Sequence, residues 1–275
     1  MTPTATTPTA MTVEFRPIPS LDPLAPLRRR YVERATAPLD GMWLCGLAPA
    51  AAHVGLVLNE VLAGYYCLND DGFLLQFHVD EALRPRAIEL FKTVASQDEV
   101  RGAFASTAEP EYLSLCMDHF PRVEVNALLY QHHGPPPASP PLGLIRLGAT
   151  ELGEAVDFAS EAIGAPKAWL HGYYEGLISR QELFALRIQD VLVGLGESRG
   201  FAGLQPGYAD LGVIVGQKHR GQGLATQVLR DLVRTNEHRG VRSICSTEVT
   251  NAAAQTAIRR AGFVAHNRIV QLHAS

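Results

Sequence analysis

The feature of this sequence that most constrains its fold is a predicted strand, a glycine turn and a helix in direct succession, within residues 210–263. An apolar run at 211–215 predicts a buried strand, and an amphipathic pattern predicts a helix over about 224–237. Between them lies RGQGLA at 220–225. The first amides of such a helix have no partner within the helix, so they point beyond its N-terminus. The stretch therefore predicts a site for an anion, such as the phosphate groups of a cofactor.

Two familiar glycine-rich motifs fit this turn poorly. GQGLAT begins like a dinucleotide fingerprint, but its sixth position is Thr226 and no acidic residue closes a following strand at the expected distance. A P-loop is excluded because no Gly-Lys-Ser/Thr follows four residues after a glycine. The short RGQGLA pattern recurs by composition in many proteins, so its meaning depends on the residues around it.

The rest of the chain predicts two halves with nearly the same order of elements. In the first half we expect strands at 13–17, 54–58, 62–68, 73–79, 102–106 and 123–130, with helices at 23–35, 82–94 and 110–119. In the second half we expect strands at 144–147, 183–188, 191–195, 211–215 and 242–248, helices at 151–163, 168–179, 224–237 and 251–260, and two last strands after Gly262. The pattern predicts an α/β fold with a mixed sheet and an internal duplication.

Composition predicts where the halves separate. Residues 1–11 are rich in Thr, Pro and Ala and predict a disordered tail, and HHGPPPASPP at 132–141 predicts a semi-rigid linker. We therefore expect one domain at 12–131 and a second at 142–275. His132 and His133 are interpreted as solvated linker residues rather than metal ligands.

Charge and cysteine content narrow the function. Acidic residues outnumber basic ones by 28 to 24, which gives no general attraction to nucleic acid or to anionic lipid. Four widely spaced cysteines disfavour a zinc site and a disulfide framework. The first residues have no signal-peptide pattern, and no apolar run is long enough to span a bilayer. We expect a soluble, cytoplasmic protein without a metal, a membrane or a nucleic acid as partner.

Three sequence segments in the second half resemble the GCN5-related N-acetyltransferase (GNAT) superfamily. They are Val213-x-Val215 on the strand, RGQGLA at 220–225, and Asn251-x-x-Ala254 followed by Ala261-Gly262-Phe263. The resemblance implies acetyl-CoA as co-substrate. It implies that the turn amides cradle the pyrophosphate and that the strand offers main-chain groups to the pantetheine arm.

By this resemblance, Val213 and Val215 make the strand contacts and Asn251 bonds the pantetheine. The residues expected to hold the phosphates are Arg220, Gly221, Gln222, Gly223, Leu224, Ala225 and Thr226. Glycines let the backbone approach a diphosphate closely, and the helix dipole favours its charge. Lys218 and His219 are expected to add positive charge nearby.

The first half has the same order of elements without the glycine turn. After the strand ending at Val79 the sequence reads DEALRP at 80–85. Its carboxylates repel a diphosphate, and Pro85 lacks an amide donor. We interpret the first half as a degenerate GNAT-like domain that packs on the second, shapes the substrate cleft or forms a dimer contact.

Acetyl transfer to an amine requires a base, a polarised thioester carbonyl and a proton for the leaving thiolate. Asp210 and Glu197 are the leading candidates for the base, and Glu248 is a weaker one. Backbone amides around Val215 are the expected donors to the oxyanion. Many family members carry a tyrosine seven residues after the asparagine, but this chain has Ile258.

Other groups near the predicted site remain open as alternatives. Tyr173 and Tyr174 are interpreted as packing residues or as substitutes for the missing tyrosine acid. His266 and His273 are interpreted as ordinary strand histidines.

The leading hypothesis is therefore an acetyl-CoA-dependent N-acetyltransferase. It moves an acetyl group to a primary amine, on a small molecule or a peptide, by direct attack in a ternary complex. The alternative is a non-catalytic acyl-CoA sensor or assembly module, suggested by Ile258. A homodimer is compatible with either.

Overall fold

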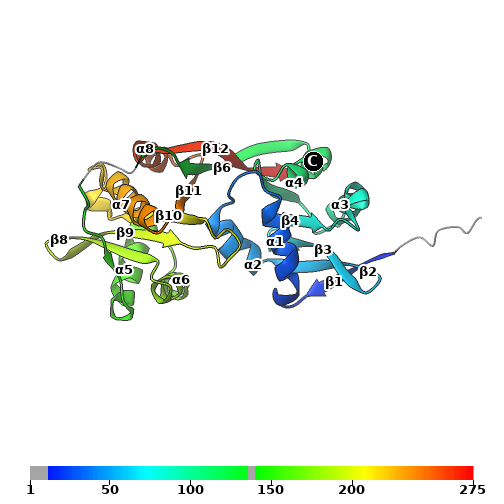
Figure 1. The fold of residues 1–275 in the computed structure, drawn as a ribbon, viewed down its shortest axis with the longest axis horizontal. Helices are drawn as coiled ribbons and strands as arrows, with labels where there is room; N and C mark the ends of the chain where they lie inside the picture. Colours follow the sequence, from blue (N-terminus) through cyan, green and yellow to red (C-terminus); the bar gives the residue numbers. More distant parts are fainter. Residues whose placement is uncertain (1–11, 136–139, 275) are drawn as a thin grey trace, which may run out of the picture.

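A single sheet of 12 strands runs through both halves of the protein in the computed structural model, which describes residues 12–135 and 140–274. The strand order is β1-β2-β3-β4-β5-β12-β6-β11-β10-β9-β8-β7 (Figure 1). The predicted tail at 1–11 and part of the predicted linker, 136–139, lie outside the described residues.

The first half contains the predicted strands and helices, together with a π-helical turn and a short helix at 43–50 that the sequence pattern does not predict. Its elements are β1 (Val13–Ile18), α1 (Ala25–Glu33), a π-helical turn (Trp43–Leu47) leading to α2 (Ala48–Ala50), β2 (Ala52–Leu58), β3 (Val61–Leu68), β4 (Phe73–Val79), α3 (Ala87–Ala95), β5 (Gly102–Ser106), α4 (Pro110–His119) and β6 (Arg122–His132).

The second half repeats this order. Its elements are β7 (Ile145–Arg146), α5 (Leu152–Ile163), α6 (Lys167–Ser179), β8 (Leu183–Ile188), β9 (Val191–Arg199), β10 (Tyr208–Val215), α7 (Leu224–His238), β11 (Arg242–Glu248), α8 (Ala252–Arg260) and β12 (Phe263–His273). Both halves therefore have the same mixed α/β architecture, and the predicted fold class is confirmed.

The two halves exchange their last strands. β6, at the end of the first half, pairs with β11 and β12 of the second, while β12 pairs with β5 of the first. Because β6 and β12 are antiparallel neighbours over most of their length, the halves share one continuous hydrogen-bonded ladder.

Several boundaries differ from the sequence predictions, and three of these differences affect the strand exchange or the site. The two short strands expected after Gly262 are one strand, β12, with a register irregularity between Ala265 and Asn267 that interrupts the polar–apolar alternation. His132 is not a linker residue, because it ends β6 opposite Phe263. β9 extends to Arg199, so Glu197 lies within the strand rather than after it.

Separate apolar cores stabilise the two halves. In the first half, α3 and α4 pack on β4 and β5 through residues such as Phe77, Phe91 and Phe120. In the second, α7 and α8 cover one face of the sheet, and α5 and α6 cover the other. A smaller core joins the halves, where Tyr31 and Leu39 share a cluster with Phe201 and Ile244.

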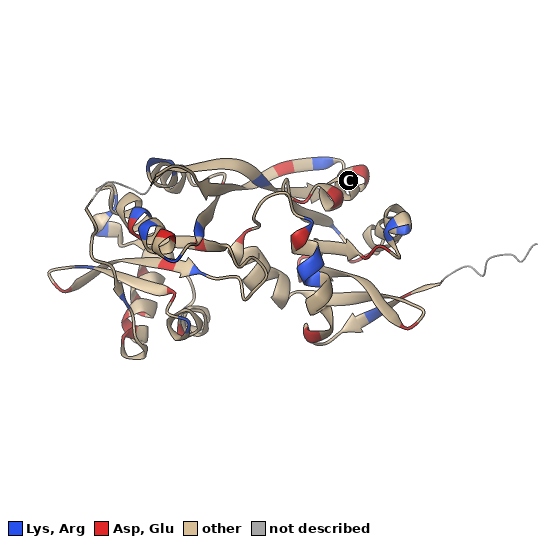
Figure 2. Ribbon diagram, in the orientation of Figure 1, with Lys and Arg blue, Asp and Glu red and all other residues tan. Residues whose placement is uncertain are grey.

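Lys, Arg, Asp and Glu are interspersed along both halves (Figure 2). No helix among the described residues is both long enough and apolar enough to span a membrane.

Candidate active site

The parallel strands β10 and β11 diverge at the centre of the second half. They pair only at Tyr208–Arg242, Ala209–Ser243 and Asp210–Ile244. Beyond Asp210, β10 keeps its other neighbour, β9, as far as Val215. One edge of β10 is therefore left without a strand partner over residues 211–215.

The hydrogen-bond alternation of β10 shows which main-chain groups face this opening. The amide of Gly216 bonds the carbonyl oxygen of Val193 on β9 at 3.0 Å. Since antiparallel strands alternate the side on which they bond, the amides of Val213 and Val215 point away from β9, toward β11. They are positioned for the main-chain contacts expected from the sequence.

The glycine turn leads directly into α7. Gly221 and Gly223 have φ values of 75° and 81°, in the left-handed region that glycine tolerates best. Gly223 is the N-cap of α7 and has no side-chain cap, and the first turn holds no acidic residue. Among the described residues, no backbone acceptor outside the helix is recorded for the amides of 221–226. The end of α7 is thus a set of free donors.

Basic residues of the turn play different parts. Arg220 directs its guanidinium to main-chain carbonyls, with Nε 3.2 Å from the oxygen of Val215 and one terminal nitrogen 2.6 Å from that of Ala162. It therefore ties the turn to β10 and to the end of α5 in this conformation. Lys218 is exposed and His219 is half-buried, beside the turn.

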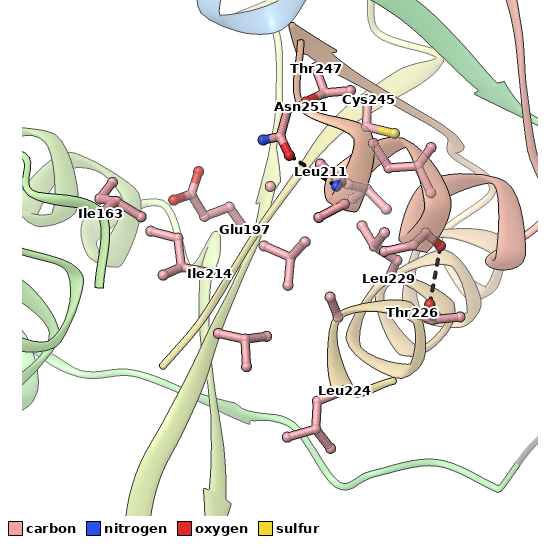
Figure 3. Close-up of a pocket in the computed structure, with 18 of the residues that line it drawn as sticks. Ile163, Glu197, Leu211, Ile214, Leu224, Thr226, Leu229, Cys245, Thr247 and Asn251 are labelled. Carbon is pink, nitrogen blue, oxygen red and sulfur yellow. Dashed lines mark hydrogen bonds between the residues drawn. The ribbon is translucent and has the colours of Figure 1, made fainter. Parts of the chain in front are cut away.

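A cavity of about 780 Å³ connects the glycine turn with the gap between β10 and β11. Its lining comes from α5, α6, β9, β10, the turn, α7, β11 and α8. Figure 3 shows Glu197 and Ile214 on one side of the cavity, with Cys245, Thr247 and Asn251 on another. Of the residues expected to bind a cofactor, Gln222 is absent from this lining, while Val213, Val215, Arg220, Gly221, Gly223, Leu224, Ala225, Thr226 and Asn251 belong to it.

Glu197 reaches the cavity because of the residue opposite it. Gly212 pairs with Glu197 across β9 and β10, and a Cβ at Gly212 would lie 2.8 Å from the Oε2 atom of Glu197. The glycine therefore leaves room for the carboxylate to lie over β10. Tyr173 donates to Oε2 at 2.7 Å and Arg199 donates to the same oxygen at 2.8 Å. The other oxygen, Oε1, has no recorded partner in the described chain.

Asp210 is buried beneath the cavity rather than on its wall. Its side chain is fully buried and its Oδ2 accepts from Arg199 at 2.6 Å. Burial raises the pKa of Asp210 to about 7, and Arg199 partly offsets this effect. Asp210 is absent from the cavity lining, and its bond to Arg199 connects it to a residue that belongs to that lining.

Both tyrosines of α6 line the cavity. Burial raises the pKa of Tyr173 and of Tyr174 well above their ordinary value, so both hydroxyls are neutral. Tyr173 bridges Glu197 and Arg199. Tyr174 is fully buried and belongs to the apolar core between α6 and the sheet.

Asn251 caps α8 while remaining on the cavity wall. Its Oδ1 accepts from the amide of Ala254 at 3.1 Å, and Figure 3 shows its amide nitrogen turned away from the helix. Ile258, two helical turns further along α8, is 4% exposed and also lines the cavity. The position expected to carry a hydroxyl acid is therefore apolar, although Thr226 and Thr247 are hydroxyl groups on the same lining.

The remaining candidates lie outside this site. Glu248 is exposed at the end of β11 and is absent from the cavity lining. His266 packs against His133, and His273 packs against Phe73 in the first half. Within 12–135 and 140–274, no group of three or more His, Cys, Asp or Glu side chains is positioned to hold a metal ion.

Several site residues carried too weak a signal to be predicted from the sequence. Arg199, Gly212 and Trp169 reach the cavity from positions that the sequence pattern describes only as strand or helix. Met42 comes from the other half of the chain. The polar–apolar alternation along β9 breaks at Glu197 and Arg199, and this break is the sequence signal that could have indicated Arg199.

Comparison with known proteins agrees with this architecture. A model of the GNAT acetyltransferase domain matches residues 20–133, and a model of the GNAT acetyltransferase family matches residues 152–263. No curated protein matches the sequence significantly.

Solved structures extend the similarity over the whole chain. An acetyltransferase of the GNAT family from Colwellia psychrerythraea is 42% identical, with 95% of this chain and 100% of that chain covered and a TM-score of 0.90. A GCN5-related N-acetyltransferase from Sphaerobacter thermophilus has a TM-score of 0.61 at 17% identity, with 94% of each chain covered. A tandem GNAT protein from the clavulanic acid biosynthesis pathway has a TM-score of 0.59 at 16% identity, with 94% of this chain and 98% of that chain covered. The last two support the fold alone.

The fold and the cleft define a protein of the acyltransferase class with two related domains in one chain. The chain belongs to the GNAT acetyltransferase family and carries two GNAT domains in tandem.

Proposed function

We propose that the protein is an acetyl-CoA-dependent N-acetyltransferase that acetylates a primary amine by direct attack in a ternary complex. The observation that carries the proposal is that one cavity connects the free amides at the N-terminus of α7 with the carboxylate of Glu197. A site for a diphosphate and a site for an amine are thus connected through the gap between β10 and β11.

The residues of the second half divide the work of binding. The amides of 221–226 and the dipole of α7 would hold the diphosphate, and the open glycines leave room for it. The free edge of β10 would bind the pantetheine arm through Val213. The amide nitrogen of Asn251 would bond the same arm from the other side.

Acetyl-CoA supplies a thioester, whose carbonyl carbon the amine nitrogen attacks as a C–N bond forms and the C–S bond breaks. The amide of Val215 faces the opening and would donate to the developing oxyanion. Oε1 of Glu197 would accept the proton that the amine loses. Tyr173 and Arg199 hold this carboxylate in place through Oε2. Water or a cavity hydroxyl would protonate the thiolate.

The test combines calorimetric titration with acetyl-CoA and a free-thiol assay over a panel of primary amines. We expect binding of one acetyl-CoA per chain and thiol release with at least one amine, together with an acetylated product by mass spectrometry. Absence of acetyl-CoA binding would contradict the proposal.

A second candidate is an acyl-CoA sensor without catalysis. Ile258 favours it, because the buried isoleucine has no proton for a leaving thiolate. Acetyl-CoA binding with no thiol release for any amine would support the sensor and reject the transferase.

The acceptor is a small molecule or a peptide, and we propose a soluble cytoplasmic protein that binds neither membrane nor nucleic acid. We also propose a homodimer, and the molar mass from light scattering tests it.

A further inference from the structure

The first half contributes a wall to the cavity of the second. Met42 lines the cavity although it precedes every other lining residue by more than a hundred positions. The preceding residue, Gly41, lies directly against Asp210, because a Cβ at Gly41 would be 2.5 Å from the Oδ2 atom of Asp210. The segment therefore packs against the carboxylate that bonds Arg199, a residue of the cavity lining.

Buried hydrogen bonds hold this segment in place. The amide of Leu39 donates to Oε1 of Gln205 at 2.8 Å, and the Nε2 atom of Gln205 donates back to the carbonyl oxygen of Leu39 at 3.0 Å. Both residues are buried. The side chain of Asp40, two residues before Met42, accepts from the amide of Trp43, the residue after Met42, at 2.7 Å. Met42 is thus presented from a fixed backbone.

An aromatic surface lines the cavity from α6. Trp169 and Tyr173 stack with ring centroids 4.9 Å apart and an interplanar angle of 12°. Both line the cavity, and Trp169 is 50% exposed. A half-exposed indole backed by a second ring is a rigid, flat apolar surface of the kind that anchors a ligand.

The charge of the lining limits the acceptor. Among the described residues that line the cavity, Glu197 is the one carboxylate, and it is accompanied by Arg199. A polyamine or another multiply charged cation needs several carboxylates, so this lining suits a single ammonium or amine on an apolar body. Since Tyr173 bonds Glu197, the aromatic surface and the carboxylate are directly connected.

We propose that the acceptor is a primary amine carried on an aromatic or similarly flat apolar body, bound between Met42 of the first half and the Trp169–Tyr173 stack, with its nitrogen at Glu197. This inference rests on the proposed transferase function. Methionine suits such a wall because its flexible thioether packs well against aromatic rings.

The experiment compares phenethylamine, butylamine and ethanolamine as acceptors at saturating acetyl-CoA. We expect kcat/KM to decrease in that order. Met42→Ala and Trp169→Ala should each lower kcat/KM for phenethylamine by about tenfold, mainly through KM, while ethanolamine changes little. Trp169→Phe should restore most of the loss. Met117→Ala, an exposed methionine on α4, is the matched control and should leave all three amines unchanged.

The same amines are also titrated calorimetrically, with and without acetyl-CoA. This readout separates the two proposals: binding of phenethylamine that Met42→Ala weakens, without thiol release, supports the subsite and rejects the transferase. A preference for ethanolamine or for a polyamine such as spermidine, or an acceptor profile that Met42→Ala leaves unchanged, overturns the subsite even when turnover is normal.

Discussion

The two halves of the chain contain the same opening between parallel strands, and it is filled differently in each. β10 and β11 separate after Asp210, and both line the cavity of about 780 Å³. β4 and β5 pair only at Phe73–Gly102 and Leu74–Ala103, and a pocket of about 280 Å³ lies between the end of β4 and α4. In the first half, Tyr112 donates to the carbonyl oxygen of Leu74 at 3.0 Å, so a side chain occupies an acceptor on the diverging strand.

The N-caps of the last helices show the difference most clearly. Asn251 is the N-cap of α8 and Glu109 is the N-cap of α4. The two N-caps make the same backbone hydrogen bonds: the amide of each bonds the carbonyl oxygen three residues earlier, and the carbonyl oxygen of each accepts from the amide four residues later. Asn251 is exposed on its cavity, but Glu109 is buried, accepts from the amide of Ser106 at 2.7 Å and is hydrogen-bonded by Tyr31. In the first half, Tyr31 bonds the N-cap side chain, whereas in the second half the N-cap side chain lies on a cavity and is available to a ligand.

The two helix N-termini differ in the same sense. The first turn of α3 contains Glu89, which pairs with Arg86, and the preceding residues include Pro85. The first turn of α7 contains no acidic residue and begins at a glycine. One topology thus supports an anion site only where the helix end is left unneutralised.

The largest expected effect distinguishes Glu197, at the opening of the second half, from Glu109, at the opening of the first. Glu197→Gln should lower kcat by about a thousandfold with acetyl-CoA affinity unchanged, because the base of the transfer is lost. Glu109→Gln should leave kcat within about twofold. Steady-state kinetics measure both, with Glu175→Gln on the exposed face of α6 as control. Circular dichroism checks that both variants are folded. Equal turnover in a folded Glu197→Gln variant and the wild type would contradict the role of Glu197 as the base.

The next effect concerns the pH dependence of stability. Burial raises the pKa of Glu109 to about 7, above the value of about 4.3 for an unfolded chain. The folded state therefore keeps a proton that the unfolded chain releases, and the free energy of unfolding falls by roughly 3 to 4 kcal/mol as pH rises from about 4 to about 7. This contribution is full below that window and is lost above it.

Glu109→Gln should remove this dependence, so the variant gains stability relative to the wild type as pH rises through the window. Urea unfolding at several pH values measures the difference. Glu33→Gln, on the exposed surface of α1, should show none. A difference for Glu109→Gln that stays constant with pH would contradict the buried-proton account.

A smaller effect tests the glycine turn. Gly223→Val should weaken acetyl-CoA binding by about a hundredfold, since a branched side chain disfavours a positive φ and disturbs the amides at the start of α7. Gly240→Val is a matched control, because Gly240 has a φ of 70° at the other end of α7. Titration calorimetry should show normal affinity for the control. Similar losses in both variants would indicate general strain rather than a phosphate site.

The smallest effect concerns the plugged opening of the first half. Tyr112→Phe leaves the buried carbonyl of Leu74 without its partner and should cost about 1 to 2 kcal/mol of stability. Acetyl-CoA affinity and the binding of one molecule per chain should not change. Appearance of a second acetyl-CoA site in this variant would show that the first half needs only this hydroxyl removed to bind the co-substrate.

Local sequence patterns are enough to predict the order of most elements, the mixed α/β class and the residues of the glycine turn. These follow from local patterns: an apolar run over β10, a pair of glycines before α7, and an asparagine that caps α8. The family followed from the spacing of those three segments. Such features act over a few residues, and local physical chemistry is sufficient to predict them.

Which side chains meet in the cavity depends on tertiary packing and cannot be predicted from local patterns. Asp210 and Glu197 were equal candidates for the base along the chain, yet one is sealed beneath Arg199 and the other reaches the cavity over Gly212. The exchange of β6 and β12, and with it the arrival of Met42 beside the second half, depends on pairing between distant strands. Register and burial across such distances depend on the whole packed sheet, and no short stretch of sequence records them.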